Sequence, residues 1–307
     1  MRRSSFAVVA VVALALAGCG GDAATDAAFE GAATVPPSAA TPADPAAAAA
    51  VDRAMTEATR VAATTTTDPA TPPATTTATT TDADARPLAG RTIVLDPGHN
   101  GASASRPDVI NRTVWIGNRR KACQAVGTTS VRGLTEHRFN WLLAGALRRE
   151  LRERGARVVL TRGDDRGVGP CIDRRARIAN AANADAAVSI HGDGGPPAGR
   201  GFHVILPGRV PQVRGHDAIV APSRRLGLEL RRAYRRGTGV PYATYLGRAG
   251  LDVRTDLGGL NLLRVPGVMV ETGNMRNATD ARLMSSAAWR ARAARALADG
   301  VTRFLER

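Results

Sequence analysis

The feature that most limits how this chain can fold is an alternation of short apolar runs with longer helical repeats across residues 87–307. The apolar runs are β-branched and end at glycine, proline or a polar residue, as buried strands do. We expect strands at Thr92–Leu95, Arg157–Thr161, Ala187–His191, Gly201–Leu206 and Val268–Glu271. We expect helices at Thr135–Arg154, Ile172–Asn183 and near Ser223–Arg235, with one or two between Ala278 and Leu305. This pattern predicts one three-layer α/β/α domain with a mostly parallel central sheet.

The first 19 residues have the pattern of an export signal. Arg2 and Arg3 precede a short apolar run that ends in Leu16-Ala-Gly-Cys19. The run is too short to span a membrane comfortably, so it predicts a secretory segment. Its ending resembles the lipobox of bacterial lipoproteins, which implies acylation of Cys19 and a membrane anchor outside the cytoplasm. The alternative is an ordinary cleaved signal with an incidental cysteine.

Residues 20–86 consist largely of Ala, Thr, Pro and Asp, with runs such as Ala46–Ala50. Such a segment buries too little apolar surface to offset the entropy of ordering the chain. We therefore expect a disordered linker between the signal and the domain. Its role would be to let the domain extend away from the membrane.

The predicted domain is strongly basic. The whole chain has 42 Lys and Arg and 27 Asp and Glu, of which residues 1–86 hold five and nine, so the domain keeps 37 and 18, a net charge of +19. A charge of this size attracts polyanions. Nucleic acid is the usual partner of such domains, but the export signal and the scarcity of aromatic residues favour an acidic polymer of the bacterial wall. We expect no nucleic-acid partner.

Two cysteines, Cys123 and Cys171, remain when Cys19 is assigned to the signal. In an oxidising compartment outside the cytoplasm, such a pair forms a disulfide by default. The alternative, a pair of zinc thiolates, lacks further cysteines to complete a site.

Metal-ligating side chains stand where several of the predicted elements begin or end. His99 follows the first strand after Pro97-Gly98, His191 ends a later strand, and Glu136 opens the helix that begins at Thr135. Because the carboxyl ends of parallel strands meet at one edge of a sheet, these side chains are expected to converge. Imidazole and carboxylate ligands suit zinc, and three ligands with an open fourth position indicate a catalytic site.

Glu271 ends another strand at the same expected edge. Zinc would lower the pKa of a bound water toward about 7, and Glu271 would act as general base and then as general acid. The spacing of the four residues is not a compact signature. Taken singly, a histidine at a strand end is commonly a hydrogen-bonding residue, and a glutamate at a helix start commonly complements the helix dipole.

Six ordered segments resemble zinc-dependent N-acetylmuramoyl-L-alanine amidases, and in particular the AmiC-type catalytic domain of exported actinobacterial members. They are Ile93–Gly101, Leu134–Asn140, Val158–Arg162, Arg175–Asn180, Ala187–His191 and Val268–Asn274. The resemblance covers nearly all of residues 87–307. It implies an α/β/α fold and hydrolysis of the amide between N-acetylmuramic acid and L-alanine in peptidoglycan or muropeptides.

The resemblance also assigns residues. It places the family's zinc ligands, one Zn²⁺ per domain, on His99, Glu136 and His191, and its catalytic glutamate on Glu271. Arg175 lies in the family's Arg-x-x-x-Ala-Asn segment, which leaves an organising role, substrate binding or a structural ion pair open.

Other residues carry weaker expectations. Asn261 is a candidate for lining the substrate groove. Gly192-Asp193 replaces the Ala-Asn of many relatives, which predicts a different charge beside the zinc. The segment Ala102–Gly133 is expected to form a loop or hairpin over the site, pinned by the disulfide. His137, His203 and His216 are expected to have surface or core roles.

Three functions remain open from sequence. A zinc amidase, expected to be a monomer, is favoured. A non-catalytic wall-binding lipoprotein has no use for a base aimed at zinc-bound water, which argues against that alternative. The third is another zinc hydrolase of the wall, such as a peptidase or deacetylase.

Overall fold

The structure, a computed structural model, describes residues 86–306. The predicted signal and nearly all of the predicted linker lie outside this range. Six strands form the central sheet: β1 (Thr92–Pro97), β4 (Arg157–Leu160), β5 (Ala186–Asp193), β6 (His203–Pro207), β7 (Leu251–Arg254) and β8 (Gly267–Asn274). Their order is β4-β1-β5-β8-β6-β7. The β6–β8 pairing is antiparallel and the other four are parallel, as expected of a mostly parallel sheet.

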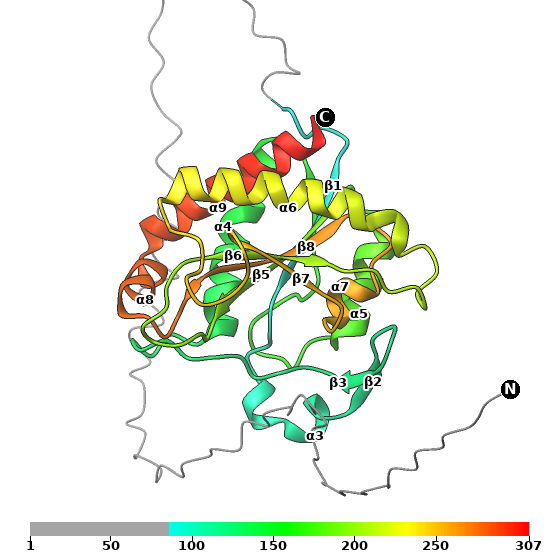
Figure 1. The fold of residues 1–307 in the computed structure, drawn as a ribbon, viewed down its shortest axis with the longest axis horizontal. Coiled ribbons are helices and arrows are strands. Elements are labelled where there is room, and N and C mark those ends of the chain that lie inside the picture. Colours follow the sequence, from blue (N-terminus) through cyan, green and yellow to red (C-terminus); the bar gives the residue numbers. More distant parts are fainter. Residues whose placement is uncertain (1–85, 307) are drawn as a thin grey trace, which may run out of the picture. The chain divides into compact units, whose positions relative to one another are not determined.

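Helices cover both faces of the sheet, which confirms the expected α/β/α fold class (Figure 1). They are α4 (Glu136–Glu153), α6 (Asp217–Thr238) and α9 (Ala287–Leu305) on one face, and α5 (Ile172–Ala181) and α7 (Gly258–Asn261) on the other. Between β8 and α9 lies α8 (Ala278–Ser285), so the predicted closing segment is two helices with a break at Ser286. None of the described helices is long and apolar enough to span a membrane.

Each sheet face has its own apolar layer because successive side chains of a strand point to opposite faces. In β1, Ile93 and Leu95 join the core beneath α4, α6 and α9, and Val94 joins the core beneath α5. The next residue on the α5 side is Asp96, a carboxylate rather than an apolar side chain. The α5 face thus turns polar as the strands reach their carboxyl ends.

The amphipathic helix α4 connects this sheet to the site. Its buried stripe includes Phe139, Leu143 and Leu147, which repeat at helical spacing and are fully covered by the sheet and α9. The preceding Thr135 is extended, so the helix begins at Glu136. Packing of the stripe therefore fixes where Glu136 lies, at the carboxyl edge of the sheet.

The segment between β1 and α4 contains short elements that the sequence did not resolve individually. They are a 3₁₀ turn (Ser103–Ser105), α3 (Pro107–Ile110) and the hairpin strands β2 (Thr113–Trp115) and β3 (Arg120–Ala122). The expected disulfide is present and joins Cys123, just after β3, to Cys171, just before α5. The hairpin segment is therefore fastened to the helix that carries Arg175.

Candidate metal centre and active site

The turn after β1 brings His99 toward the neighbouring strand. Gly98 donates its backbone N–H to the carbonyl oxygen of Ile190 at 3.0 Å, and a Cβ at position 98 would overlap the ring of His191. His99 has φ +58°, a left-handed conformation that is uncommon outside glycine. Its Nδ1 lies 2.8 Å from the carbonyl oxygen of Ala125, a contact that orients Nε2 inward.

The three expected metal ligands converge at this point. Oε1 of Glu136 lies 3.0 Å from Nε2 of His99 and 2.9 Å from Nδ1 of His191. One ligand atom from each residue lies within 4.8 Å of the other two. Two imidazole nitrogens and a carboxylate oxygen at these separations fit the ligand set and bond lengths of a tetrahedral zinc ion with an open fourth position.

Backbone contacts hold the carboxylate of Glu136 in this position. Its Oε2 accepts the N–H of Thr128 at 2.9 Å, and its Oε1 accepts that of Gly192 at 3.3 Å. Burial tends to raise the pKa of Glu136, but the adjacent imidazoles of His99 and His191 outweigh it and keep the pKa low. The carboxylate is therefore ionised, the form in which it binds a metal.

Glu271 lies beside these residues through strand register. In the β5–β8 pair it is the partner of His191, so both side chains leave the sheet on the same face. The residue is partly buried, and its Oε2 atom, which is fully buried, has no hydrogen-bond partner among the described residues. Burial, followed by the charges of Glu136 and Asp193, raises its pKa well above the ordinary glutamate value. A carboxyl group with a raised pKa suits both directions of proton transfer at neutral pH.

A second group of side chains, His203, Tyr245 and Asp193, lies near Glu271. The sequence did not connect this group with the site. His203 on β6 is the antiparallel partner of Glu271 and is fully buried, consistent with the expected core role. Tyr245 lies edge-on to the His203 ring and donates its hydroxyl to Oδ2 of Asp193 at 2.8 Å. Asp193 thus contributes a carboxylate to this group, at the end of the strand that pairs with β8.

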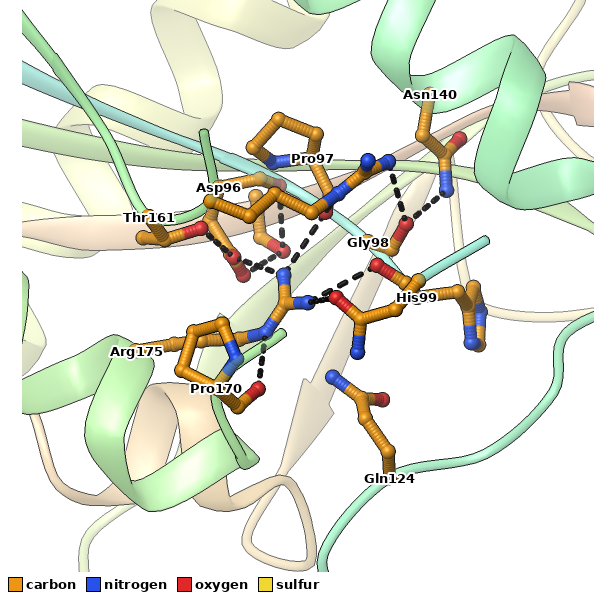
Figure 2. A network of polar contacts seen from close by, with 12 residues as sticks. Asp96, Pro97, Gly98, His99, Gln124, Asn140, Thr161, Pro170 and Arg175 are labelled. Atoms are coloured by element: carbon orange, nitrogen blue, oxygen red, sulfur yellow. Dashed lines mark hydrogen bonds and ion pairs between the residues drawn. The ribbon is translucent and has the colours of Figure 1, made fainter. Parts of the chain in front are cut away.

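Arg175 organises the turn that carries His99 (Figure 2). Its guanidinium, 3% exposed, donates to Oδ1 of Asp96 at 2.6 Å and to the carbonyl oxygens of Pro97 at 2.8 Å and His99 at 2.9 Å. It also donates to Oδ1 of Asn100 at 2.7 Å. These contacts hold two backbone carbonyls and two side chains around the left-handed histidine, so Arg175 both organises the turn and forms a structural ion pair, two of the roles left open by the sequence.

Asp96 is the charged partner in that network. Its carboxylate also accepts the hydroxyls of Thr161 at 2.6 Å and Ser189 at 2.7 Å, one from each flanking strand (Figure 2). Burial tends to raise the pKa of Asp96, but the charge of Arg175 and these hydrogen bonds lower it to about 2. The turn after β1 therefore rests on a buried ion pair.

The structure corrects the expectation for Asn261. Its side chain is fully buried, and its Nδ2 donates to the carbonyl oxygens of Ile116 at 3.0 Å and Thr255 at 2.8 Å. It joins α7 to the hairpin segment rather than lining a groove. The two hydrogen bonds hold the Asn261 side chain inside the protein, and no pattern in the sequence reveals them.

The other two histidines have structural partners. His137, half-buried, places Nδ1 3.0 Å from Oδ1 of Asp165. His216 is buried, with its ring nitrogens 3.0 Å from the carbonyl oxygen of Gly208 and 3.3 Å from that of Leu263. Neither joins the metal centre.

A cavity of about 190 Å³ opens beside the metal centre. Its walls include His99, His191 and Met269. Ala122 at the end of the hairpin and Gln124 just after it form another side. The hairpin segment therefore forms one side of the cavity that opens onto the two imidazoles.

Comparison with known proteins identifies the family of this chain. Residues 93–303 match the Amidase_3 family model, described as N-acetylmuramoyl-L-alanine amidase. The N-acetylmuramoyl-L-alanine amidase Rv3717 of Mycobacterium tuberculosis is 43% identical over 228 residues, 73% of this chain and 91% of the relative. The apo crystal structure of Ami1 from Mycobacterium abscessus is 43% identical with a TM-score of 0.65, over 71% of this chain and 100% of that one. Ami1 of Mycobacterium smegmatis is 42% identical with a TM-score of 0.66, over 71% and 98%. The chain therefore belongs to the Amidase_3 family of N-acetylmuramoyl-L-alanine amidases.

Proposed function

We propose that this protein is a zinc-dependent amidase of the bacterial wall that hydrolyses the amide between the lactyl group of N-acetylmuramic acid and L-alanine. The observation that carries the proposal is the meeting of four residues from separate elements. His99 from the turn after β1, Glu136 from α4 and His191 from β5 converge within 4.8 Å, and Glu271 is the register partner of His191. Family membership supports the bond that is cleaved.

The chemistry divides between the ion and the protein. Nε2 of His99, the carboxylate of Glu136 and Nδ1 of His191 would hold the zinc. When bound, zinc polarises the substrate carbonyl and lowers the pKa of the attacking water toward about 7. Glu271 removes a proton from that water as its oxygen bonds to the carbonyl carbon. The same carboxyl group then delivers a proton to the amide nitrogen as the C–N bond breaks. The products are a lactyl carboxylate and the free amino group of L-alanine.

The residues that precede the catalytic domain are expected to bring the enzyme to the cell wall. We infer that residues 1–19 export the protein and that acylated Cys19 anchors it at the outer face of the cytoplasmic membrane, with residues 20–86 as a tether. The disulfide between Cys123 and Cys171 is consistent with an oxidising compartment. A Cys19→Ala variant is expected to leave the membrane fraction, and retention there would contradict the lipid anchor.

Digestion of a soluble muropeptide followed by mass spectrometry tests the reaction. The expected product is a peptide with a new L-alanine amino end; no product would favour a wall-binding protein, and a cut elsewhere would favour another hydrolase. Glu271→Gln is expected to keep one bound zinc and to lower kcat by about 10² to 10⁴, whereas His99→Ala should lose the zinc. Glu153→Gln, an exposed substitution at the far end of α4, is the matched control. Full activity of Glu271→Gln would refute the assigned role.

A further inference from the structure

A hollow on the outer surface of α4 is the strongest candidate for a second binding site. It measures about 300 Å³ and is lined by Trp141, Gly145, Arg148, Arg149, Arg152 and Leu160. The first five lie on one side of α4, since residues three and four apart are neighbours on a helix surface. Leu160 comes from β4, the edge strand of the sheet. These six residues are named the α4 groove.

The three arginines of the α4 groove form no ion pair within the part of the chain that the structure describes. No ion pair joins Arg148, Arg149 or Arg152 to any carboxylate of residues 86–306, and the buried Nε of Arg148 lacks a hydrogen-bond partner there. Glu150, the acidic residue between them in sequence, pairs with Arg295 of α9 instead. The groove is therefore a concentration of positive charge with unused donors, which favours an anionic ligand.

Trp141 adds a flat apolar surface to this charge. The guanidinium of Arg162 lies over its ring, 5.0 Å from the centroid. Arg162 is itself held by the carbonyl oxygens of Pro97 at 2.9 Å and His137 at 2.8 Å, so the indole rests on a fixed support. Half-exposed Trp141 offers a platform for the C–H face of a sugar ring, with the arginines beside it for acidic substituents.

The proposed reaction creates a polymer with these two properties. Hydrolysis converts each neutral lactyl amide of the glycan into a carboxylate, so a strand that has lost its stem peptides carries sugar rings and regularly repeated negative charge. The groove is within reach of the reaction, because Trp141 lies five residues beyond Glu136 on α4, or roughly 7.5 Å along the helix axis.

We propose that the α4 groove binds the peptide-free glycan strand that the enzyme itself produces, with a sugar ring on Trp141 and lactyl carboxylates on Arg148, Arg149 and Arg152. This inference rests on the proposed function for the identity of the product. Binding there would hold the enzyme on wall regions that it has already begun to process.

Affinity for two matched glycans tests the proposal. One probe is peptide-free glycan with lactyl carboxylates, and the other is the same glycan with those groups converted to carboxamides. Titrations use the full chain, the groove variant Arg148→Gln/Arg149→Gln/Arg152→Gln, and the control variant Arg224→Gln/Arg236→Gln/Arg292→Gln. The control removes equal charge from exposed arginines for which no partner is recorded among the described residues.

The groove variant should bind the carboxylate glycan about tenfold more weakly than the unaltered chain, and the control should differ by about twofold at most. Trp141→Leu should also weaken binding of the carboxylate glycan, when its concentration is corrected for the fraction of protein that is folded. The carboxamide glycan should bind poorly to the unaltered chain and to all the variants. Equal weakening by both triple variants, or equal affinity for the two glycans, would overturn the proposal.

Turnover of a small soluble muropeptide separates this result from the proposed function. The groove variant should keep full turnover because none of its substitutions touches the metal centre. An unaltered chain without turnover would refute the amidase mechanism, whereas the comparison of the two glycans would still decide whether the groove recognises lactyl carboxylates.

Discussion

The buried ion pair beneath the metal centre makes a quantitative prediction for Asp96→Asn. The substitution preserves the shape of the side chain but removes the negative charge that faces Arg175 at 2.6 Å. In the folded protein the pKa of Asp96 falls from 3.8 to about 2, which corresponds to roughly 2 kcal/mol of stability at neutral pH. Since the asparagine variant lacks this contribution, its free energy of unfolding should be lower by about that amount at pH 7.

The sign of the pH dependence follows from the lowered pKa. A carboxyl group of this kind stabilises the fold above its unfolded pKa, and the contribution is lost as the pH falls through the folded value. The stability difference between the unaltered chain and Asp96→Asn should therefore be constant from pH 7 to about pH 5 and shrink toward pH 2.

Urea denaturation of the metal-free protein at several pH values measures this difference, and a chelator keeps zinc from contributing. Asp108→Asn is the matched control, because Asp108 is exposed and pairs with Arg106 on the surface. Its substitution should change stability little at any pH. A difference for Asp96→Asn that stays the same from pH 7 to pH 3 would refute the role assigned to its charge.

Three further predictions concern the site. Gly98→Ala should weaken zinc affinity about tenfold or more, because the added Cβ overlaps the His191 ring. Gly163→Ala is the control and should leave zinc affinity unchanged, because the space around Gly163 is open. Equal zinc affinities of the two variants in a chelator competition would contradict this prediction. Cys123→Ser removes the disulfide to Cys171, so amide hydrogen exchange should become faster over residues 102–133 while α4 stays protected. Unchanged protection of residues 102–133 would show that the disulfide does not hold this segment in place. In the metal-free protein, burial and then the charges of Glu136 and Asp193 raise the pKa of Glu271, so its side-chain carboxyl carbon should titrate above pH 4.5 by NMR. A midpoint at or below 4.5 in that form would contradict this effect of its surroundings.

The fold class followed from local patterns because the central strands are apolar on both faces. The ends of β1, β4, β5 and β8 all lie within three residues of their expected positions. The helix predicted from Ser223 begins at Asp217 and runs through Pro222, since tertiary packing outweighed the usual effect of proline. The strand β7 and the short helix α7 were missed because four residues show no usable periodicity.

The convergence of His99, His191 and Glu271 was predictable from a single rule, that parallel strands present their carboxyl ends at one edge. Glu136 required the additional expectation that its helix starts at that edge. The place of His203 beside Glu271 was not predictable, because alternation within a strand identifies its face but not its neighbour. That neighbour depends on the antiparallel β6–β8 pairing between residues far apart in sequence.

The position of β8 sets an order of assembly during synthesis. This strand is the last of the sheet to leave the ribosome, yet it lies between β5 and β6, near the middle. A nascent chain that ends before Gly267 already contains all three residues that would grip the ion but lacks Glu271. The sheet therefore cannot close, and Glu271 cannot take its place opposite His191, until β8 has been added between strands that were made before it.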